Sequence, residues 1–232
     1  MIKVEQHLEQ VREYYRTHRS VDGQAEGTIY AIWERGRAFN DSVTPSTYVP
    51  EYRSHMTLKL LSLTAPGAAV FSLGCGNGFV EGDLVALDRT VRAIDFNDEA
   101  VALTRGRGVD AFVADYFDLT PADLAGTDLL YADGFLGHVF TAEETVTPAL
   151  AQLTGLGLRS GAYVVLSNDA PYDPAADYAP HERVAGFWFV SREYLGQELA
   201  RAGLVPVESY YFPYLRPISG LRNRTICVAR VP

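Results

Sequence analysis

The stretch of residues 70–79, VFSLGCGNGF, constrains the fold of this chain more than any other. Four strand-like residues lead into a turn that has glycine at every second position, Gly74, Gly76 and Gly78. Glycine is needed where the backbone takes a positive φ or comes within contact distance of a ligand, because a Cβ would clash there. A strand that ends in such a turn and opens a helix is typical of a nucleotide pocket. We therefore expect an α/β fold with a nucleotide-type site at this turn.

The spacing of these glycines indicates which nucleotide the site binds. A dinucleotide fold needs G-x-G-x-x-G, whose third glycine lets the helix pack on the strand. Here Phe79 occupies that third position and Gly78 comes one residue early. The G-x-G-x-G form resembles the first motif of the class I (Rossmann-like) S-adenosylmethionine (SAM) methyltransferases of the small-molecule type.

Later segments extend the resemblance over roughly residues 68–169. A second strand ends in Asp95, the acid that in such folds accepts hydrogen bonds from both ribose hydroxyls. A third apolar run ends in Asp115 and Tyr116, which match the family position where a carboxylate takes the adenine amino group and the next N–H meets the ring. A fourth run continues to His138, which looks like the end of the family's fourth motif. The resemblance implies SAM as cofactor and these cofactor-binding residues: Gly74, Gly76, Gly78, Asp95, Phe96, Asp115 and Tyr116, with Tyr14 and Tyr15 from an N-terminal lid.

One position departs from the family pattern. Many members carry Glu or Asp two residues before the first glycine, where it helps to hold the methionine amino group, and this chain has Ser72. Glu81, in the first turn of the following helix, is a candidate to supply that charge. The alternative is that Glu81 only favours the helix N-terminus electrostatically.

Apolar periodicity predicts a helical segment before the sheet. Residues 1–63 form a helical cap, with a helix from Val4 to Tyr15, a loop at 17–28, a short helix at 29–39 and a third helix near 51–63. Residues 64–232 form the SAM-binding unit of the same globular body. Expected strands lie near 68–73, 90–95, 109–114, 127–133 and 161–168, helices near 79–87, 97–105, 120–125, 142–155 and 191–202, and a final hairpin at 205–211 and 225–231. This alternation implies a parallel sheet, and the family implies seven strands in the order 3-2-1-4-5-7-6 with the last strand antiparallel.

The net charge and the composition limit the classes of partner that this chain can bind. The formal net charge is −9, and no Lys/Arg block is present that could hold nucleic-acid phosphates, so a small-molecule acceptor is expected. The densest basic stretch, residues 215–224, reads as a solvated hairpin loop. Two cysteines and no zinc-like spacing predict no metal, and the lack of a signal peptide or a long apolar run predicts a cytoplasmic protein without membrane contact. The oligomeric state stays open.

Aromatic residues of the cap and the insertion at 169–188 are expected to roof the site, either shielding the sulfonium and a flat acceptor or simply packing the cap onto the sheet. The acceptor-side residues expected are Tyr30, Trp33, Asn168, Asp169 and His181. His138 is the first candidate for a base that takes a proton from the acceptor, and Asp133 is the second. A structural role is the alternative for each.

These patterns predict SAM-dependent methyl transfer to an oxygen or nitrogen of a small molecule, in specialised-metabolite biosynthesis. Two alternatives stay open. One is an enzyme of the same fold that has lost methyl transfer and catalyses elimination or ring closure, suggested by Ser72 and by the polar pair Asp133 and His138. The other is a non-catalytic binding subunit.

Overall fold

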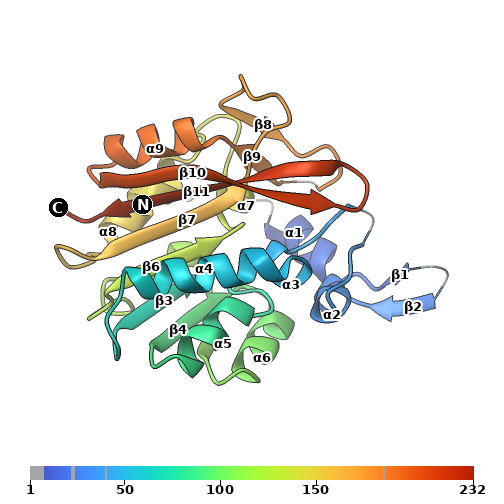
Figure 1. Cartoon of the computed structure of the whole chain (residues 1–232), viewed down its shortest axis with the longest axis horizontal. Coiled ribbons are helices and arrows are strands. Elements are labelled where there is room, and N and C mark those ends of the chain that lie inside the picture. The colour runs from blue at the N-terminus through green and yellow to red at the C-terminus, as the bar shows by residue number, and fades with distance from the viewer. Residues whose placement is uncertain (1–7, 22–23, 40, 185) are drawn as a thin grey trace.

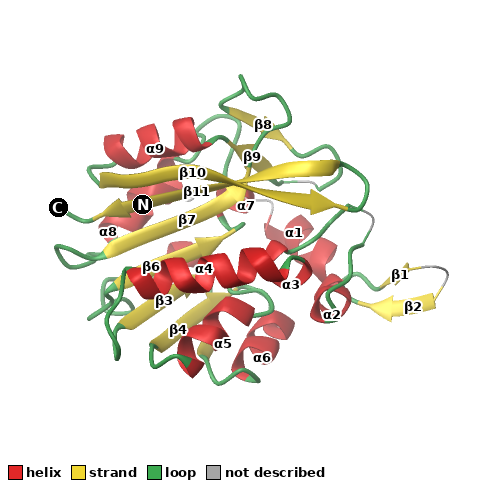
Figure 2. Cartoon of the chain, in the orientation of Figure 1, coloured by secondary structure: helices red, strands yellow, loops and turns green. Residues whose placement is uncertain are grey.

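The chain folds around a seven-stranded sheet (Figures 1 and 2). The structure is a computed structural model that describes residues 8–21, 24–39, 41–184 and 186–232. The strands, in their order across the sheet, are β10 (Val205–Arg216), β11 (Gly220–Arg230), β7 (Tyr163–Asp169), β6 (Leu129–Asp133), β3 (Ala69–Leu73), β4 (Thr90–Asp95) and β5 (Asp110–Val113). β11 runs antiparallel to all the other strands of this sheet, which are parallel to one another. The predicted strand order and the antiparallel last strand are confirmed.

Helices cover both faces of the sheet (Figure 2). One face packs against α4 (Pro50–Ser62), α5 (Phe79–Ala86) and α6 (Asp98–Arg105). The other packs against α7 (Leu136–Val139), α8 (Thr147–Gly155) and α9 (Arg192–Arg201). Ser191 caps α9 through its side chain, which accepts a hydrogen bond from the Tyr194 N–H. In the described part of the chain, no helix is both long and apolar enough to cross a membrane.

The N-terminal cap differs from its predicted layout. It consists of α1 (Leu8–Arg16), β1 (Arg19–Val21), β2 (Gln24–Gly27), α2 (Ile29–Glu34) and α3 (Pro45–Tyr48), which lead into α4. The predicted loop at 17–28 is therefore wrong, because β1 and β2 pair as a hairpin. The helix predicted for 29–39 ends at Glu34, two residues before Gly36, whose φ is +66°. The predicted start of the first helix at Val4 lies outside the described residues.

Two further helix predictions are wrong in part. Residues 120–125 form turns, because the Asp123 carboxylate accepts hydrogen bonds from the backbone and hydroxyl of Thr120; the nearest helical turn is η1 (Tyr116–Asp118). The helix predicted for 142–155 begins only at Thr147, since Thr141 and Thr145 pair across a tight turn before it. The insertion at 169–188 contributes β8 (Tyr178–Pro180), which pairs with β9 (Trp188–Val190).

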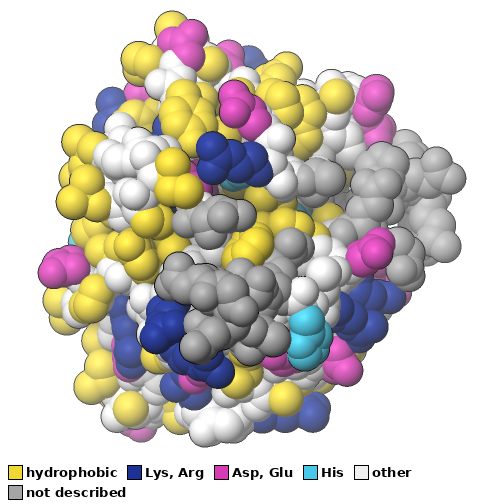
Figure 3. Space-filling view, turned by 90° about the vertical axis from the view of Figure 1, so that its right-hand side faces the viewer, with side chains coloured by type: hydrophobic (Ala, Val, Ile, Leu, Met, Phe, Trp, Pro, Cys, Tyr) yellow, Lys and Arg dark blue, Asp and Glu magenta, His cyan; other side chains and the backbone are white. Residues whose placement is uncertain are grey.

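Figure 3 views the molecule from the side toward which β6 and β7 point. Hydrophobic side chains gather in the upper part of this face, whereas Lys and Arg side chains lie mainly in its lower half, next to Asp and Glu. Charges of both signs are therefore interspersed on the visible part of this face. The carboxyl ends of the parallel strands open on this side, where a ligand site of this kind of sheet is expected.

Candidate active site

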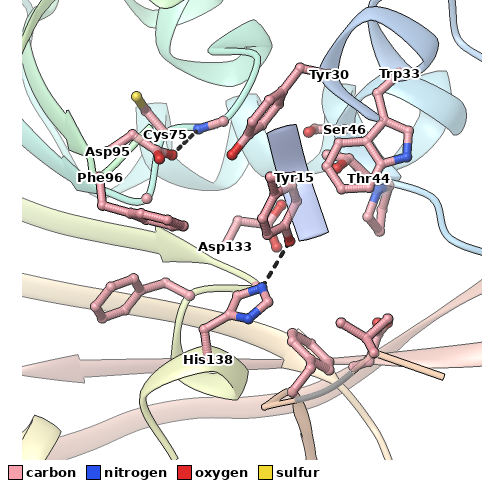
Figure 4. Close-up of a pocket in the computed structure, with 18 of the residues that line it drawn as sticks. Tyr15, Tyr30, Trp33, Thr44, Ser46, Cys75, Asp95, Phe96, Asp133 and His138 are labelled. Atoms are coloured by element: carbon pink, nitrogen blue, oxygen red, sulfur yellow. Dashed lines mark hydrogen bonds between the residues drawn. The ribbon is translucent and has the colours of Figure 1, made fainter. Parts of the chain in front are cut away.

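A cavity lies at the carboxyl edge of the central strands, beneath the cap (Figure 4). Most residues that the sequence assigned to a site meet here. The predicted residues that line it are Gly74, Gly76, Asp95, Phe96, Asp115, Tyr116, Tyr14, Tyr15, Tyr30, Trp33, Asp133, His138, Asp169 and His181. Gly78 and Asn168 are not among its lining residues. Motifs spread over more than half of the chain thus converge on one chamber.

The glycine turn and Asp95 form the floor of the cavity. The Asp95 carboxylate accepts hydrogen bonds from the N–H of Gly76 at 3.0 Å and of Asn97 at 2.9 Å. Burial raises the pKa of Asp95 to about 6, although these backbone hydrogen bonds act against the shift. Gly76 has a φ of +53°, and a Cβ added there would meet only the Tyr30 ring, at 4.0 Å. The space beside the turn is therefore left for a ligand.

Gly78 is required for packing, not for the cavity. Its φ is +69°, and a Cβ would lie 2.4 Å from the Thr104 hydroxyl oxygen on α6. Asn168 is also structural: its side chain accepts from the Gly137 N–H and donates to the carbonyls of Asp169 and Trp188. The expectation that these two residues touch cofactor or acceptor does not fit their placement.

Asp115 and Tyr116 lie at the far end of the floor. The Asp115 carboxylate accepts from the Phe117 N–H at 2.9 Å and so caps η1. The Tyr116 hydroxyl donates to the Ala149 carbonyl at 2.7 Å, which fixes the buried ring as a wall.

Tyr15 on α1 closes the cavity from above. Its ring stacks on Tyr30 with centroids 5.2 Å apart and meets Trp33 and Phe96 edge-on. Its hydroxyl lies 2.9 Å from Nε2 of His138 (Figure 4). This contact joins the N-terminal cap to α7, which follows β6, across 123 residues of sequence. The hydrogen bond between Tyr15 and His138 therefore holds α1 over the cavity.

His138 is neutral in this setting. Burial lowers its pKa to about 4, and the neighbouring His181 adds to the shift. Its Nδ1 has no hydrogen-bond partner in the described part of the structure, while Nε2 is engaged by Tyr15. The imidazole is therefore unprotonated near neutral pH.

The residues 215–224, predicted as a solvated loop, instead bring two buried arginines to the cavity. Arg224 contacts Asp133 through Nε at 3.1 Å and Asp169 through Nη1 at 3.0 Å. Arg216 pairs with the other Asp169 oxygen and donates to the Asp41 carbonyl in the cap at 3.3 Å. Burial alone would raise the pKa of Asp169, but the two guanidinium groups outweigh it and hold the pKa well below its usual range. Asp133 is thus an ion-pair partner and not a free base.

Several cavity residues escaped the sequence analysis. Arg216, Arg224 and Tyr131 line the cavity, and Tyr52 donates to Asp133 at 3.0 Å from α4. Arg222 and Arg224 stand at alternate positions, which places them on one face of a strand, but nothing in the local sequence indicates that this face is buried. Glu81, whose role the sequence left open, also lines the cavity, and its carboxylate accepts from the Ser72 hydroxyl at 2.7 Å.

Metal ligands are not assembled in the part of the chain that the structure covers. No group of three or more His, Cys, Asp or Glu side chains among the described residues could hold a metal ion.

Comparison with known proteins gives one relative of high similarity. The chain is 61% identical over 227 residues to the tabtoxin biosynthesis enzyme of Pseudomonas amygdali pv. tabaci, an alignment that covers 98% of this chain and 90% of that protein. No protein-family model matches the chain.

Solved structures of low sequence identity share the fold. The magnesium protoporphyrin IX methyltransferase of Synechocystis PCC 6803, with bound SAM, superposes with a TM-score of 0.62 at 17% identity, covering 96% of this chain and 95% of that chain. The 1,6-didemethyltoxoflavin-N1-methyltransferase of Burkholderia thailandensis, with its substrate and S-adenosylhomocysteine, gives a TM-score of 0.59 at 20% identity, covering 92% and 98%. The fold of this chain is that of the class I SAM-dependent methyltransferases.

The buried ion pairs predict a pH-dependent defect. We expect Arg224→Met to lower the free energy of unfolding by about 3–5 kcal/mol at pH 7, because Asp133 loses its cation and Asp169 one of two. In the wild type, the pKa of Asp169 is depressed, so its contribution is present above the unfolded-state pKa of about 3.9 and is lost only as pH falls below it. In the variant Asp133 is a buried carboxylate without a cation and can take up a proton, so the defect should shrink between about pH 7 and pH 4.

Urea unfolding at both pH values measures this defect. Arg230→Met, at the exposed far end of the same strand, is the control. An equal loss of unfolding free energy in both variants, or a loss that does not change with pH, would show that the buried ion pairs do not stabilise the fold more than an exposed arginine does.

Proposed function

Because this chain belongs to the family of the tabtoxin biosynthesis enzyme and has the class I SAM-dependent methyltransferase fold, we propose that it transfers a methyl group from SAM to an oxygen or nitrogen of a small molecule. The relative's name, a tabtoxin biosynthesis enzyme, supports a role for this reaction in the biosynthesis of a specialised metabolite. The observation that carries the proposal is the pairing of Asp95 with the glycine turn, which opens into a chamber under an aromatic lid.

The cofactor half of the chamber suits an adenosyl group. Asp95 already accepts two backbone N–H groups, and its carboxylate is placed to accept the ribose hydroxyls as well. Gly74 and Gly76 leave room for the backbone to approach the ligand, while Phe96, Asp115 and Tyr116 bound the adenine end.

The acceptor half is enclosed by the cap and the insertion. Tyr14, Tyr15 and Trp33 come from the cap, and His181 and Phe187 from the insertion. Enclosure of this kind excludes water from a reactive sulfonium. Alignment of the acceptor with the methyl carbon is the main contribution of such a site, and can supply up to roughly 7–11 kcal/mol of the barrier.

His138 is the group placed to take the acceptor's proton. In the transfer, the acceptor atom bonds to the methyl carbon, the carbon–sulfur bond breaks, and its electron pair stays on sulfur. The acceptor's proton passes to the unpartnered Nδ1, while Nε2–H donates to the Tyr15 oxygen. A neutral imidazole is ready for this role, and proton uptake becomes easier as the sulfonium loses its charge.

Two observations bear on the alternative of a non-methylating enzyme. Glu81 lies beside Ser72 and accepts its hydrogen bond, and Asp133 is bound to Arg224. Incubation with methyl-deuterated SAM and a panel of amines, phenols and carboxylic acids tests the proposal. A labelled methyl group in a product supports it. SAM binding without a labelled product from any acceptor would favour elimination or ring closure, or a binding subunit.

Asp95 offers the most direct test of the cofactor assignment. We expect Asp95→Ala to weaken SAM binding at least tenfold, about 1.5 kcal/mol or more, because the ribose hydroxyls lose a charged acceptor. Calorimetric titration measures the Kd, with circular dichroism as the check on folding. Asp110→Ala, an exposed acid on the neighbouring strand β5, is the control and should leave the Kd unchanged. An unchanged Kd in Asp95→Ala would place the ribose elsewhere.

His138 tests the chemistry. With an acceptor that must lose a proton, His138→Ala should lower kcat by about 10²-fold or more while the Kd for SAM stays nearly constant, because the imidazole acts on the acceptor. His55→Ala is the matched control, since His55 pairs with Tyr210 and lies outside the residues that line the cavity. Full turnover in His138→Ala would mean that the enzyme works by alignment alone.

A further inference from the structure

A second polar cluster lies under the cofactor half of the cavity, formed by Ser72, Glu81 and Tyr131. Ser72 on β3 and Tyr131 on β6 are register partners, so their side chains share one face of the sheet. Glu81, in the first turn of α5, packs on that face and accepts a hydrogen bond from Ser72. Each of the three is buried, yet Glu81 and Tyr131 line the cavity.

Glu81, like Asp95, differs from Asp133 and Asp169 in having no cation beside it among the described residues. Asp133 is paired with Arg224, and Asp169 with Arg216 and Arg224. No salt bridge to Glu81 exists within the described residues. A buried carboxylate without a cation is costly to ionise, and the cost falls when a cation docks beside it.

Tyr131 supplies an independent observation. Its hydroxyl is buried and has no hydrogen-bond partner in the described structure. A buried phenol without a partner can donate a hydrogen bond to an acceptor atom of a ligand. The cluster therefore offers one acceptor for a cation and one free donor, side by side in the cavity. The α-ammonium and α-carboxylate of an amino acid present the complementary pair.

We infer that Glu81 is the counter-ion of the α-ammonium group of SAM, that Tyr131 binds the same amino-acid end, and that Glu81 releases a proton to solvent as the cofactor docks. The inference rests on the proposed cofactor. In this inference Glu81 on α5 supplies the negative charge that Ser72 cannot supply. The affinity for SAM then depends on pH, because Glu81 must lose its proton. The alternative, that Glu81 only favours the helix N-terminus, predicts neither a proton release nor a dependence on the ligand's amino group.

The direction of the pH effect follows from the surroundings of Glu81. Burial raises its pKa to about 7; the Ser72 hydrogen bond opposes this, and Asp133 on β6 and Asp83 on α5 add to it. Tyr131 on β6 and Cys75 in the glycine turn also face it, and neither is charged near neutral pH, because burial raises the pKa of each. The free protein therefore holds a proton on Glu81 below about pH 7. An ammonium favours the carboxylate form, so affinity rises with pH between about 5.5 and 7.5.

Asp95 would add a pH effect of its own, because its pKa is raised to about 6 and it is assigned to the ribose. Two probes separate the contributions. S-adenosylhomocysteine carries ribose and the amino-acid end, whereas 5′-methylthioadenosine carries ribose and no amino acid. Proton release seen with the first and not with the second belongs to Glu81.

Isothermal titration in two buffers of different ionisation enthalpy, near pH 6.5, measures both affinity and proton release. We expect Glu81→Gln to weaken S-adenosylhomocysteine about tenfold or more and to abolish the additional proton release, because the ammonium loses its charged partner. Affinity for 5′-methylthioadenosine should stay within about twofold, which also shows that the pocket is folded. Glu51→Gln, an exposed acid in the first turn of α4, is the control for a general helix-end effect.

The outcomes are distinct. Unchanged S-adenosylhomocysteine affinity and proton release in Glu81→Gln would overturn the inference and leave the proposed function standing. Equal proton release with both ligands in the wild type would overturn it without any variant. If the wild type binds neither ligand, the proposed function itself fails.

Discussion

Two buried arginines, one held between two acids and the other between an acid and a backbone carbonyl of the cap, fix the shape of the chamber. Arg224 joins β6 to β7 through Asp133 and Asp169, and Arg216 links β7 to the cap through the Asp41 carbonyl. Charges in a low-dielectric interior are stable only when their partners are complete, so these contacts must form together. The sheet edge, the last hairpin and the cap are thereby set in one arrangement, and the cavity lies between them.

The acids of the chamber divide into two groups with different electrostatics. Asp133 and Asp169 face arginines and serve the architecture. Asp95 and Glu81 have no cation beside them among the described residues, and burial raises their pKa values to about 6 and 7. The cofactor half therefore suits a ligand that brings hydroxyl donors and positive charge, as the proposed cofactor SAM does. The acceptor half is bounded by rings and by a neutral His138, which fits the proposed alignment and proton transfer.

The sequence was sufficient where the signal is local. The glycine turn, Asp95 at a strand end and the alternation of strands and helices led to the observed sheet order and the observed floor of the cavity.

The sequence was insufficient where the residues that contact each other are far apart along the chain. The sequence suggested that Arg216 and Arg224 are exposed to solvent, because the acids that pair with them lie 47 and 91 residues away along the chain. Residues 120–125 read as a helix because the side-chain turn made by Asp123 outweighs helix propensity. Gly78 matched a binding motif, yet packing against Thr104 explains it.

A crystal structure of the protein with S-adenosylhomocysteine tests the central claim most directly, because it locates every part of the cofactor at once. The account predicts the ribose hydroxyls on the Asp95 carboxylate, the amino-acid end beside Glu81 and Tyr131, and the sulfur facing the space bounded by Tyr15 and His138. A ligand bound outside this chamber, or with its ribose away from Asp95, would contradict it.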